Sequence, residues 1–291
     1  MAANEGRLRV VTFDLDDTLW DTRAAIKIAS ASFFSALSAG GLAEPTFTPE
    51  TFHSKMRTVY RAAPGTWQHD LTALRREALR RCALEDAGVK PGPALDQLVD
   101  TGVAAFLEGR NRPPLFEGVV ASLHALKRMG LVLGVITNGN ADVQRIAGLD
   151  GGLFDFSVTS AEAGAAKPAR APFELAIAKA SALVLGSGGS GGSDRPSLLP
   201  ASCFLHVGDD AECDVQGARQ LGMRSAWVNR PGVVVPPAAG SSQDTPPGLS
   251  AGMQADLVLQ SVVQLPTAAE VTAWLDGTGV AARIDAGSSR L

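Results

Sequence analysis

The stretch VVTFDLDDTLWD, residues 10–21, constrains the fold of this chain most, because an apolar strand runs directly into three carboxylates and a threonine. Val10 and Phe13 belong to the near-continuous apolar run that is typical of a parallel strand buried on both faces. Functional groups in open parallel sheets gather where the strands end. Since strand side chains alternate, Asp14 and Asp16 would face the same site if the extended backbone continues past Phe13.

These residue types suit attack on a phosphate ester. Asp14 can act as a nucleophile toward phosphorus, Asp16 can protonate the leaving oxygen, and Thr18 can bind a phosphoryl oxygen. Two anions that face a phosphate repel it, so this chemistry also needs a hard cation and a fixed positive side chain. The alternative interpretation is an acidic turn that only caps a helix.

A helical region follows without a convincing strand between Asp21 and Pro113. Apolar residues at helical spacing, capping residues and Gly or Pro stop signals predict helices over residues 22–39, from 48–49 onward, 71–87 and about 94–108. We therefore predict an all-helical domain at residues 22–112, inserted directly after the first strand.

From Phe116 the pattern alternates between helix and strand, which is typical of a parallel sheet with helices on both faces. The predicted elements are a helix at 119–129, strands at 131–136, 154–158, 224–228 and 256–259, and a closing helix at 266–275. The expected fold class is α/β, a Rossmann-like sheet formed by residues 1–21 and 113–276, with a frayed tail at 277–291.

Polar residues follow two further strands and one loop. Thr137 and Asn138 end the strand at 131–136 and offer a hydroxyl and a backbone N–H, although a threonine before an Asn-Gly turn is also ordinary turn chemistry. Lys167 precedes a proline, which biases the lysine toward an extended backbone. Asp209 ends the apolar segment FLHVG at residues 204–208 and would supply a carboxylate of the kind that magnesium prefers.

Three neighbours of Asp209 need separate interpretations. Asp214 is expected to orient the loop and its water without touching a metal ion. Asp210 has either that role or the role of capping the following helix. His206 lies inside the strand, so we expect a core or supporting histidine instead of a catalytic base.

In this order, the segments that contain Asp14, Thr137, Lys167 and Asp209 resemble the four motifs of the haloacid dehalogenase-like hydrolases. The inserted helices resemble the cap of that family. The resemblance implies a Mg²⁺-dependent phosphomonoester hydrolase that works through an aspartyl phosphate. It further implies Asp14 as nucleophile, Asp16 as general acid and base, and two ligand sets: Thr18, Thr137, Asn138 and Lys167 for the phosphoryl group, and Asp14, the Asp16 carbonyl and Asp209 for Mg²⁺.

The resemblance extends to a bacterial branch that dephosphorylates 5-amino-6-(5-phospho-D-ribitylamino)uracil and FMN in flavin metabolism. It is carried by TFDLDDTLWD, by the stretches 69–72 and 85–88, and by ITNGNA and HVGDD. A sugar phosphate or phosphoglycolate is the alternative substrate, and an inactive binding or scaffold protein is the alternative class. A dehalogenase would need neither Asp16 as an acid nor Asp209 as a metal ligand.

Trp67, His69 and Asp70 lie in an expected loop of the cap. An aromatic ring there can stack on a flat heterocycle, and the His or Asp can bind its edge or a hydroxyl. The structural alternative is that Trp67 packs inside the cap and Asp70 caps a helix.

Composition limits the partners and the compartment. The formal net charge of −4 gives no reason to expect a nucleic acid or an anionic membrane, so the expected partner is a small phosphorylated metabolite. Three separated cysteines indicate buried free thiols and no disulfide framework. The polar N-terminus is too short for a signal peptide, which favours the cytoplasm, or a plastid in a plant or alga. GSGGSGGS at 186–193 and the Pro-rich stretch at 231–248 are expected linkers or loops.

Overall fold

Six parallel strands form one sheet in the order β3-β2-β1-β4-β5-β6, which confirms the parallel sheet that the sequence predicts. The computed structural model describes residues 6–42, 47–186, 197–230 and 254–278. The strands are β1 (Val10–Phe13), β2 (Val132–Thr137), β3 (Phe156–Thr159), β4 (Phe204–Gly208), β5 (Arg224–Val228) and β6 (Leu257–Leu259). The first strand therefore lies inside the sheet, between β2 and β4.

Helices cover both faces of this sheet. The helices α6 (Val119–Arg128) and α10 (Ala269–Asp276) pack with Val11 and Phe13 in one apolar cluster. The opposite face holds α8 (Arg170–Leu185) and α9 (Gly217–Arg219), whose cluster includes Val10. Alternate side chains of β1 thus enter two separate cores, and this explains why the strand is apolar at nearly every position.

The closing segment differs from its prediction. The sequence predicts a single helix at 266–275, but the chain forms a 3₁₀ segment η6 (Val262–Thr267) before α10. Ser261 caps η6 together with Gln264, and Pro266 lies inside it. A proline lacks an N–H donor, so a short 3₁₀ segment accommodates it better than the interior of a continuous α-helix does.

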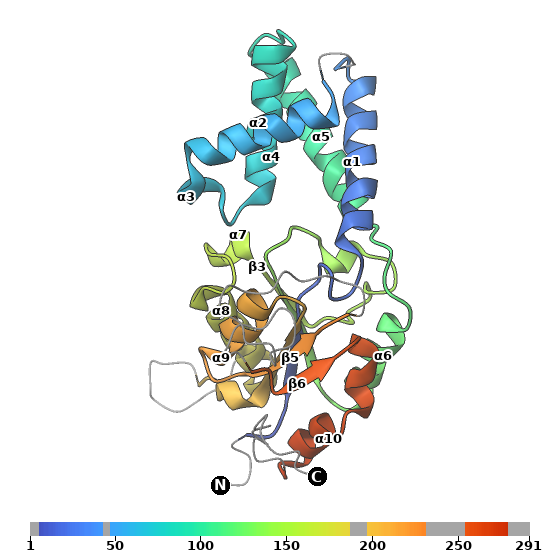
Figure 1. Ribbon diagram of the computed structural model, residues 1–291, viewed down its shortest axis with the longest axis vertical. Helices are drawn as coiled ribbons and strands as arrows, with labels where there is room; N and C mark the ends of the chain where they lie inside the picture. The colour runs from blue at the N-terminus through green and yellow to red at the C-terminus, as the bar shows by residue number, and fades with distance from the viewer. Residues whose placement is uncertain (1–5, 43–46, 187–196, 231–253, 279–291) are drawn as a thin grey trace, which may run out of the picture.

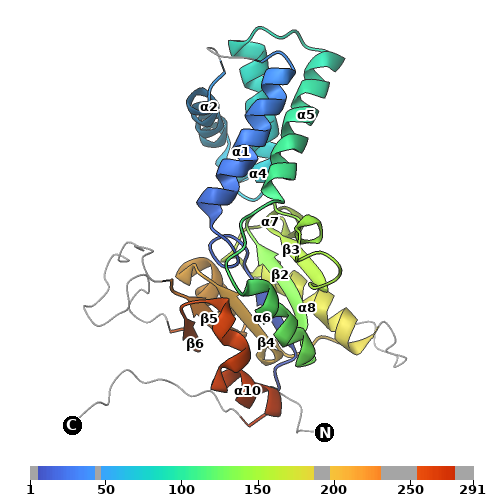
Figure 2. The same ribbon diagram turned by 90° about the vertical axis from the view of Figure 1, so that its right-hand side faces the viewer.

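Within the described part of residues 22–112, the inserted domain contains helices and connecting loops but no strand. It contains α1 (Thr22–Ala39), α2 (Pro49–Ala62), α3 (Pro64–Trp67), α4 (Leu71–Arg81), a π-helical turn η2 (Cys82–Asp86) and α5 (Pro93–Arg110). The predicted helix at 71–87 is thus α4 continued by η2, and the expected loop before it contains the short α3. Figures 1 and 2 show this helical domain at one end of the molecule, beyond the carboxyl ends of the strands.

The helical domain has its own core of aromatic side chains. Phe33 lies at its centre, with ring centroids 4.8 Å from Phe52 and 6.3 Å from Phe106. Phe106 is on α5, which packs along α1, so the two helices that join this domain to the sheet domain are fastened to each other. We call this domain the cap below.

Several sequence predictions fall wholly or mostly outside the described residues. These are the linker at 186–193, the Pro-rich stretch at 231–248 and the tail at 277–291. Within the described parts, no helix is both long and apolar enough to cross a membrane. All three cysteines are free; Cys82 and Cys203 are buried, whereas Cys213 is only half-buried.

Candidate active site

The carboxyl ends of three neighbouring strands bring the predicted polar residues together. Asp14 follows β1, Thr137 ends β2, and Asp209 follows β4. The strand register pairs Phe13 with Val135 on one side and with Val207 on the other, so these ends lie at nearly the same height. Parallel pairing of buried strands therefore places residues that are far apart in sequence at one edge.

Lys167 is the centre of the charged network at this edge. Its buried ammonium donates to Asp14 Oδ1 at 2.7 Å, to Asp214 Oδ1 at 2.6 Å and to the Ile136 carbonyl at 2.7 Å. Burial lowers the pKa of Lys167, but the two carboxylates outweigh it and raise the pKa above its ordinary value. All three N–H donors of this ammonium are used, so Lys167 is a fixed positive charge.

Asp214 is held by donors on both oxygens. His206 Nε2 lies 3.0 Å from the Oδ1 that also accepts from Lys167, and the Asp210 N–H donates to Oδ2 at 3.0 Å. Burial favours the neutral carboxyl, but Lys167 and His206 outweigh it and hold the pKa of Asp214 below its ordinary value. Gly208 makes this arrangement possible, because a Cβ there would lie 2.1 Å from Asp214 Oδ2.

Thr12 completes the network from within β1. Burial lowers the pKa of His206, so the ring is neutral and its Nε2–H donates to Asp214. The other ring nitrogen, Nδ1, then accepts from the Thr12 hydroxyl at 2.9 Å. This contact supports the expected role of His206 as a supporting residue.

Asp14, Asp209 and Asp214 form an oxygen-rich group in which one ligand atom from each lies within 4.8 Å of the others. Burial raises the pKa of Asp14 to about 7, against the opposing charge of Lys167. Burial also raises the pKa of Asp209 to about 8, and the charges of Asp14 and Asp214 act in the same direction. Crowded carboxylates of this kind fit a hard divalent cation such as Mg²⁺.

Among these three carboxylates, Asp14 and Asp209 have the freer oxygens. Both oxygens of Asp214 already accept hydrogen bonds, whereas Asp209 accepts one bond, from the Thr18 hydroxyl at 3.1 Å. Thr18 is buried and thus holds the Asp209 carboxylate in place. The donor set therefore fits a cation held by Asp14 and Asp209, with Asp214 behind them.

Asp16 points toward the cap and has an unexpected partner. Its Oδ1 accepts from Trp20 Nε1 at 2.9 Å and from the Thr22 hydroxyl at 3.1 Å. Its Oδ2 pairs with Arg110, the last residue of α5, which is 98% buried. Charge, hydrogen bonds and burial together fasten the candidate general acid to the base of the cap.

The turn after β1 has a conformation that suits its sequence. Asp17 has φ +56°, in the left-handed region that aspartate tolerates better than most residues, and its carboxylate accepts from the Thr22 N–H. Arg230 donates to the Thr18 carbonyl at 2.7 Å and lies 3.5 Å from the centre of the Phe116 ring. The loop that carries the carboxylates is therefore held from a distant part of the chain.

The segment after β2 holds the loop that carries Lys167. The Asn138 side chain exchanges two hydrogen bonds with the Lys167 backbone, at 2.7 and 3.1 Å. The Thr137 hydroxyl accepts from the Gly139 N–H at 2.9 Å. Asn138 thus positions the lysine loop, a contact that the Asn-Gly pattern alone did not predict.

Asp210 caps the turn that follows β4. Its carboxylate accepts from the N–H groups of Glu212 and Cys213 at 2.9 and 2.7 Å. Its backbone N–H donates to Asp214, as described above. The helix-cap alternative that the sequence left open for Asp210 therefore describes its side chain.

A cavity of about 280 Å³ separates the cap from this strand edge. His69, Asp70 and Thr72 line it from the cap, and Asn138, Gly139 and Ser160 are among its lining residues on the sheet domain. Ser160 Oγ donates to the His69 carbonyl at 2.9 Å, and Asn140 Nδ2 donates to Thr72 Oγ1 at 3.0 Å. We call this cavity the interdomain pocket.

The three predicted cap residues differ in their positions. His69 and Asp70 line the interdomain pocket, and Asp70 also caps α4 by accepting from the Ala73 N–H at 2.8 Å. Trp67 packs against the cap core and is not among the lining residues of this pocket. Substrate contact by Trp67 stays a prediction.

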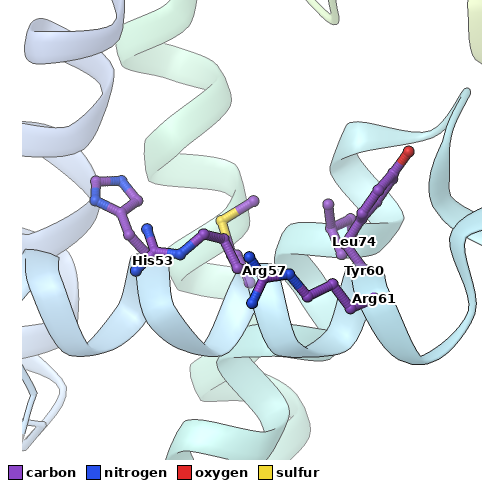
Figure 3. A pocket seen from close by; sticks show the side chains of 6 residues that line it. His53, Arg57, Tyr60, Arg61 and Leu74 are labelled. Atoms are coloured by element: carbon purple, nitrogen blue, oxygen red, sulfur yellow. The ribbon is translucent and has the colours of Figure 1, made fainter.

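A second, larger hollow of about 420 Å³ lies on the cap itself. Figure 3 shows His53, Arg57, Tyr60 and Arg61 along α2 beside Leu74 of α4. It shares no lining residue with the interdomain pocket. Nothing in its lining connects it with the carboxylates.

Three side chains of the site escaped the sequence analysis: Thr12, Arg110 and Arg230. Thr12 is a polar residue inside an apolar strand, which is a usable signal for a buried hydrogen bond. Arg110 and Arg230 come from segments far from Asp16 and Thr18 in sequence, so no local pattern indicates their contacts.

The chain has relatives of known family. A family model described as haloacid dehalogenase-like hydrolase matches residues 8–222. Phosphoserine phosphatase of Thermus thermophilus is 30% identical, with 77% of this chain and 89% of the relative covered. The 5-amino-6-(5-phospho-D-ribitylamino)uracil phosphatase of Escherichia coli is also 30% identical, with 77% and 84% covered.

A solved structure is similar as well. A structure described as 2-haloacid dehalogenase from Pseudomonas syringae is 33% identical and superposes with a TM-score of 0.71, covering 91% of this chain and 98% of the other. A phosphatase structure from Thermococcus onnurineus, at 20% identity and a TM-score of 0.54, shares the fold.

Proposed function

The chain belongs to the haloacid dehalogenase-like hydrolase family and is a phosphatase, and on that premise we propose that it hydrolyses a small phosphomonoester with Mg²⁺ through an aspartyl phosphate. The observation that carries this proposal is the Lys167 ammonium, which joins Asp14 and Asp214 within a group of three carboxylates that includes Asp209. The group combines a nucleophile, a fixed cation and free oxygens for a metal ion at one edge.

In the proposed reaction Asp14 attacks phosphorus, and the bond to the ester oxygen breaks as that oxygen takes a proton from Asp16. Asp16 then removes a proton from a water whose oxygen attacks the aspartyl phosphate, which releases inorganic phosphate and restores Asp14. When bound by Asp14, the Asp16 carbonyl and Asp209, Mg²⁺ supplies positive charge that offsets the phosphoryl charge. Thr18, Thr137, the Asn138 N–H and Lys167 are the proposed ligands of the phosphoryl oxygens. Thr18 then exchanges its bond to Asp209 for one to the phosphoryl group, and Lys167 exchanges one of its three present bonds.

The Arg110 contact adds a condition to this mechanism. Asp16 has to face the leaving oxygen to act as an acid, and its Oδ2 is occupied by Arg110. We therefore propose that substrate binding shifts Arg110 away from Asp16, so that cap position and proton transfer are coupled.

The relatives suggest which substrates to test. The two phosphatase relatives are named for phosphoserine and for 5-amino-6-(5-phospho-D-ribitylamino)uracil, and a third, from Pyrococcus abyssi, is named for glyceraldehyde 3-phosphate. All are small phosphorylated metabolites, which supports that class for this chain. The ribitylaminouracil phosphate and FMN remain the specific substrates that the sequence predicts, with His69, Asp70 and Trp67 as the proposed contacts.

Dehalogenation is the second candidate, because the similar structure from Pseudomonas syringae has that name. A dehalogenase also needs a nucleophilic carboxylate but has no alkoxide to protonate. Asp16, with three donors around it, and the metal-compatible pair Asp14 and Asp209 favour the phosphatase.

The experiment is an assay of inorganic phosphate release by the purified full chain on a panel of phosphate esters, with and without Mg²⁺. The panel includes p-nitrophenyl phosphate and the esters named above, and halide release from 2-chloropropionate is measured in parallel. We expect Mg²⁺-dependent phosphate release that disappears in Asp14→Asn. Halide release without phosphate release would overturn the proposal, and the absence of both activities would support a scaffold protein.

A further inference from the structure

Two buried arginines at the base of the cap have unused hydrogen-bond donors. Arg110 is 2% exposed, and its Nη1 has no hydrogen-bond partner. Arg75 is 9% exposed, and its Nε also has none. Because a buried guanidinium has five donors and is always charged, missing partners in two neighbouring arginines are costly.

The two guanidinium groups lie close enough to repel each other. Arg75 lies on the Phe106 ring, with its central carbon 3.3 Å from the ring centre, and Phe106 is one turn before Arg110 on α5. Burial and the charge of Arg110 together lower the pKa of Arg75 to about 10, which still leaves it charged near neutral pH. Arg110 has the Asp16 carboxylate as its counter-ion, whereas Arg75 has no ion pair with any described residue. The pair between α4 and α5 therefore carries one positive charge more than its partners offset.

Neither arginine lines the interdomain pocket, but both lie next to residues that do. A Cβ added to Gly139, which lines the pocket, would lie 3.3 Å from Arg110 Nη2 and 2.8 Å from Asp16 Oδ2. Arg75 follows Leu71 and Thr72 by one turn of α4, and both of those residues line the same pocket. Both arginines thus lie beside residues that line the interdomain pocket, and Arg110 lies beside the Asp16 carboxylate as well.

We propose that Arg75 and Arg110 bind a carboxylate on the leaving group, so that the substrate is a small phosphorylated acid. This inference rests on the phosphatase function proposed above and names its substrate class. Two planar guanidinium groups match the two oxygens of a carboxylate. An anion between them also offsets their mutual repulsion, which no neutral leaving group does.

A bound substrate carboxylate would give Arg110 a second partner besides Asp16. Its Nη2 pairs with Asp16, whereas its Nη1 is unused. A substrate carboxylate that draws Arg110 toward Arg75 weakens the pair with Asp16 and frees Asp16 Oδ2 to face the leaving oxygen. The pair is therefore expected to affect kcat as well as KM for acidic substrates.

The test compares phosphoglycolate with ethyl phosphate, two short esters that differ mainly in the carboxylate. The variant is Arg75→Gln, and the matched control is Arg76→Gln, the next residue of α4, whose side chain is 44% exposed and pairs with Asp100. We expect Arg75→Gln to lower kcat/KM for phosphoglycolate by about 30-fold, the effect of one charged hydrogen bond, and that for ethyl phosphate by less than about 3-fold. Arg76→Gln should change neither.

Equal losses on both esters would overturn the proposal, as would a wild-type enzyme that prefers ethyl phosphate. A larger loss on a bisphosphate than on phosphoglycolate would assign the arginines to a second phosphate and overturn the assignment to a carboxylate.

A binding measurement separates this proposal from the phosphatase function itself. In Mg²⁺-free buffer malonate should raise the Tm of wild type and Arg76→Gln more than that of Arg75→Gln, whether or not any ester is hydrolysed; an equal rise in all three would overturn the carboxylate site.

Discussion

The charged groups at the strand ends and those at the base of the cap, called the sheet wall and the cap wall below, differ in how completely they are paired. On the sheet side, Lys167 uses all three donors, and the oxygens of Asp214 accept from Lys167, His206 and the Asp210 N–H. On the cap side, Arg75 and Arg110 each keep a buried nitrogen without a partner. The sheet wall is therefore complete before substrate arrives, whereas the cap wall is not.

This difference indicates a division of labour. Phosphoryl chemistry needs charges that are already in place, because their reorganisation during the reaction would raise the barrier. Substrate choice needs groups whose interactions are completed only by the correct ligand, since unpaired polar groups then reject the wrong one. Variants on the two walls should accordingly differ in their effects on activity and stability.

The largest effect is expected at the nucleophile. Asp14→Asn keeps the shape of the side chain but removes the anionic oxygen, so phosphate release should fall by at least about 10³-fold. The Tm should stay near that of wild type, because the substitution also removes repulsion from Asp209 and Asp214. Phosphate release and thermal melts measure both, and turnover like that of wild type would exclude Asp14 as the nucleophile.

The next effect concerns stability on the sheet wall. Lys167→Met leaves the buried carboxylates of Asp14 and Asp214 without their cation, and we expect a loss of about 3 kcal/mol in the free energy of unfolding. Lys179→Met is the matched control, because Lys179 also bonds a carboxylate and a carbonyl but is more exposed. That control should cost less than about 1 kcal/mol. Equal losses in urea unfolding would contradict a special role for Lys167.

Metal binding should depend on Asp209. Asp209→Ala removes one of the two carboxylates with freer oxygens, and we expect the Mg²⁺ concentration for half-maximal activity to rise by about 10²-fold. A Mg²⁺ titration of phosphate release measures this change. Asp210→Ala is a suitable comparison, because its side chain caps the following turn. If both variants kept the half-saturation of wild type, the ligand assignment would be wrong.

The smallest effect is expected on the cap wall. Arg75→Met removes a buried charge that has no carboxylate partner, so the free energy of unfolding should change by less than about 1 kcal/mol. Loss of the contact with Phe106 opposes the relief from burial and from repulsion by Arg110. A loss as large as that of Lys167→Met would show that the two walls do not differ in this respect.

The sequence by itself determined the parallel sheet and the order of the chemical groups along it. Apolar strands that end in Asp14, Thr137 and Asp209 are local patterns, and parallel strands bring their carboxyl ends to one edge. The helical insertion after Asp21 is likewise a run of local periodicities. These features need only neighbours within a few residues, so they can be read before any fold is known.

Only the tertiary structure decided which groups pair. Lys167 lies 153 positions from Asp14, and Arg110 lies 94 positions from Asp16, so no periodicity relates them. The same holds for the unpaired nitrogens of Arg75 and Arg110, because an arginine on a helix gives no sign of whether a partner lies beside it. Burial and pairing depend on how the cap packs over the strand ends, and that packing is a property of the whole chain.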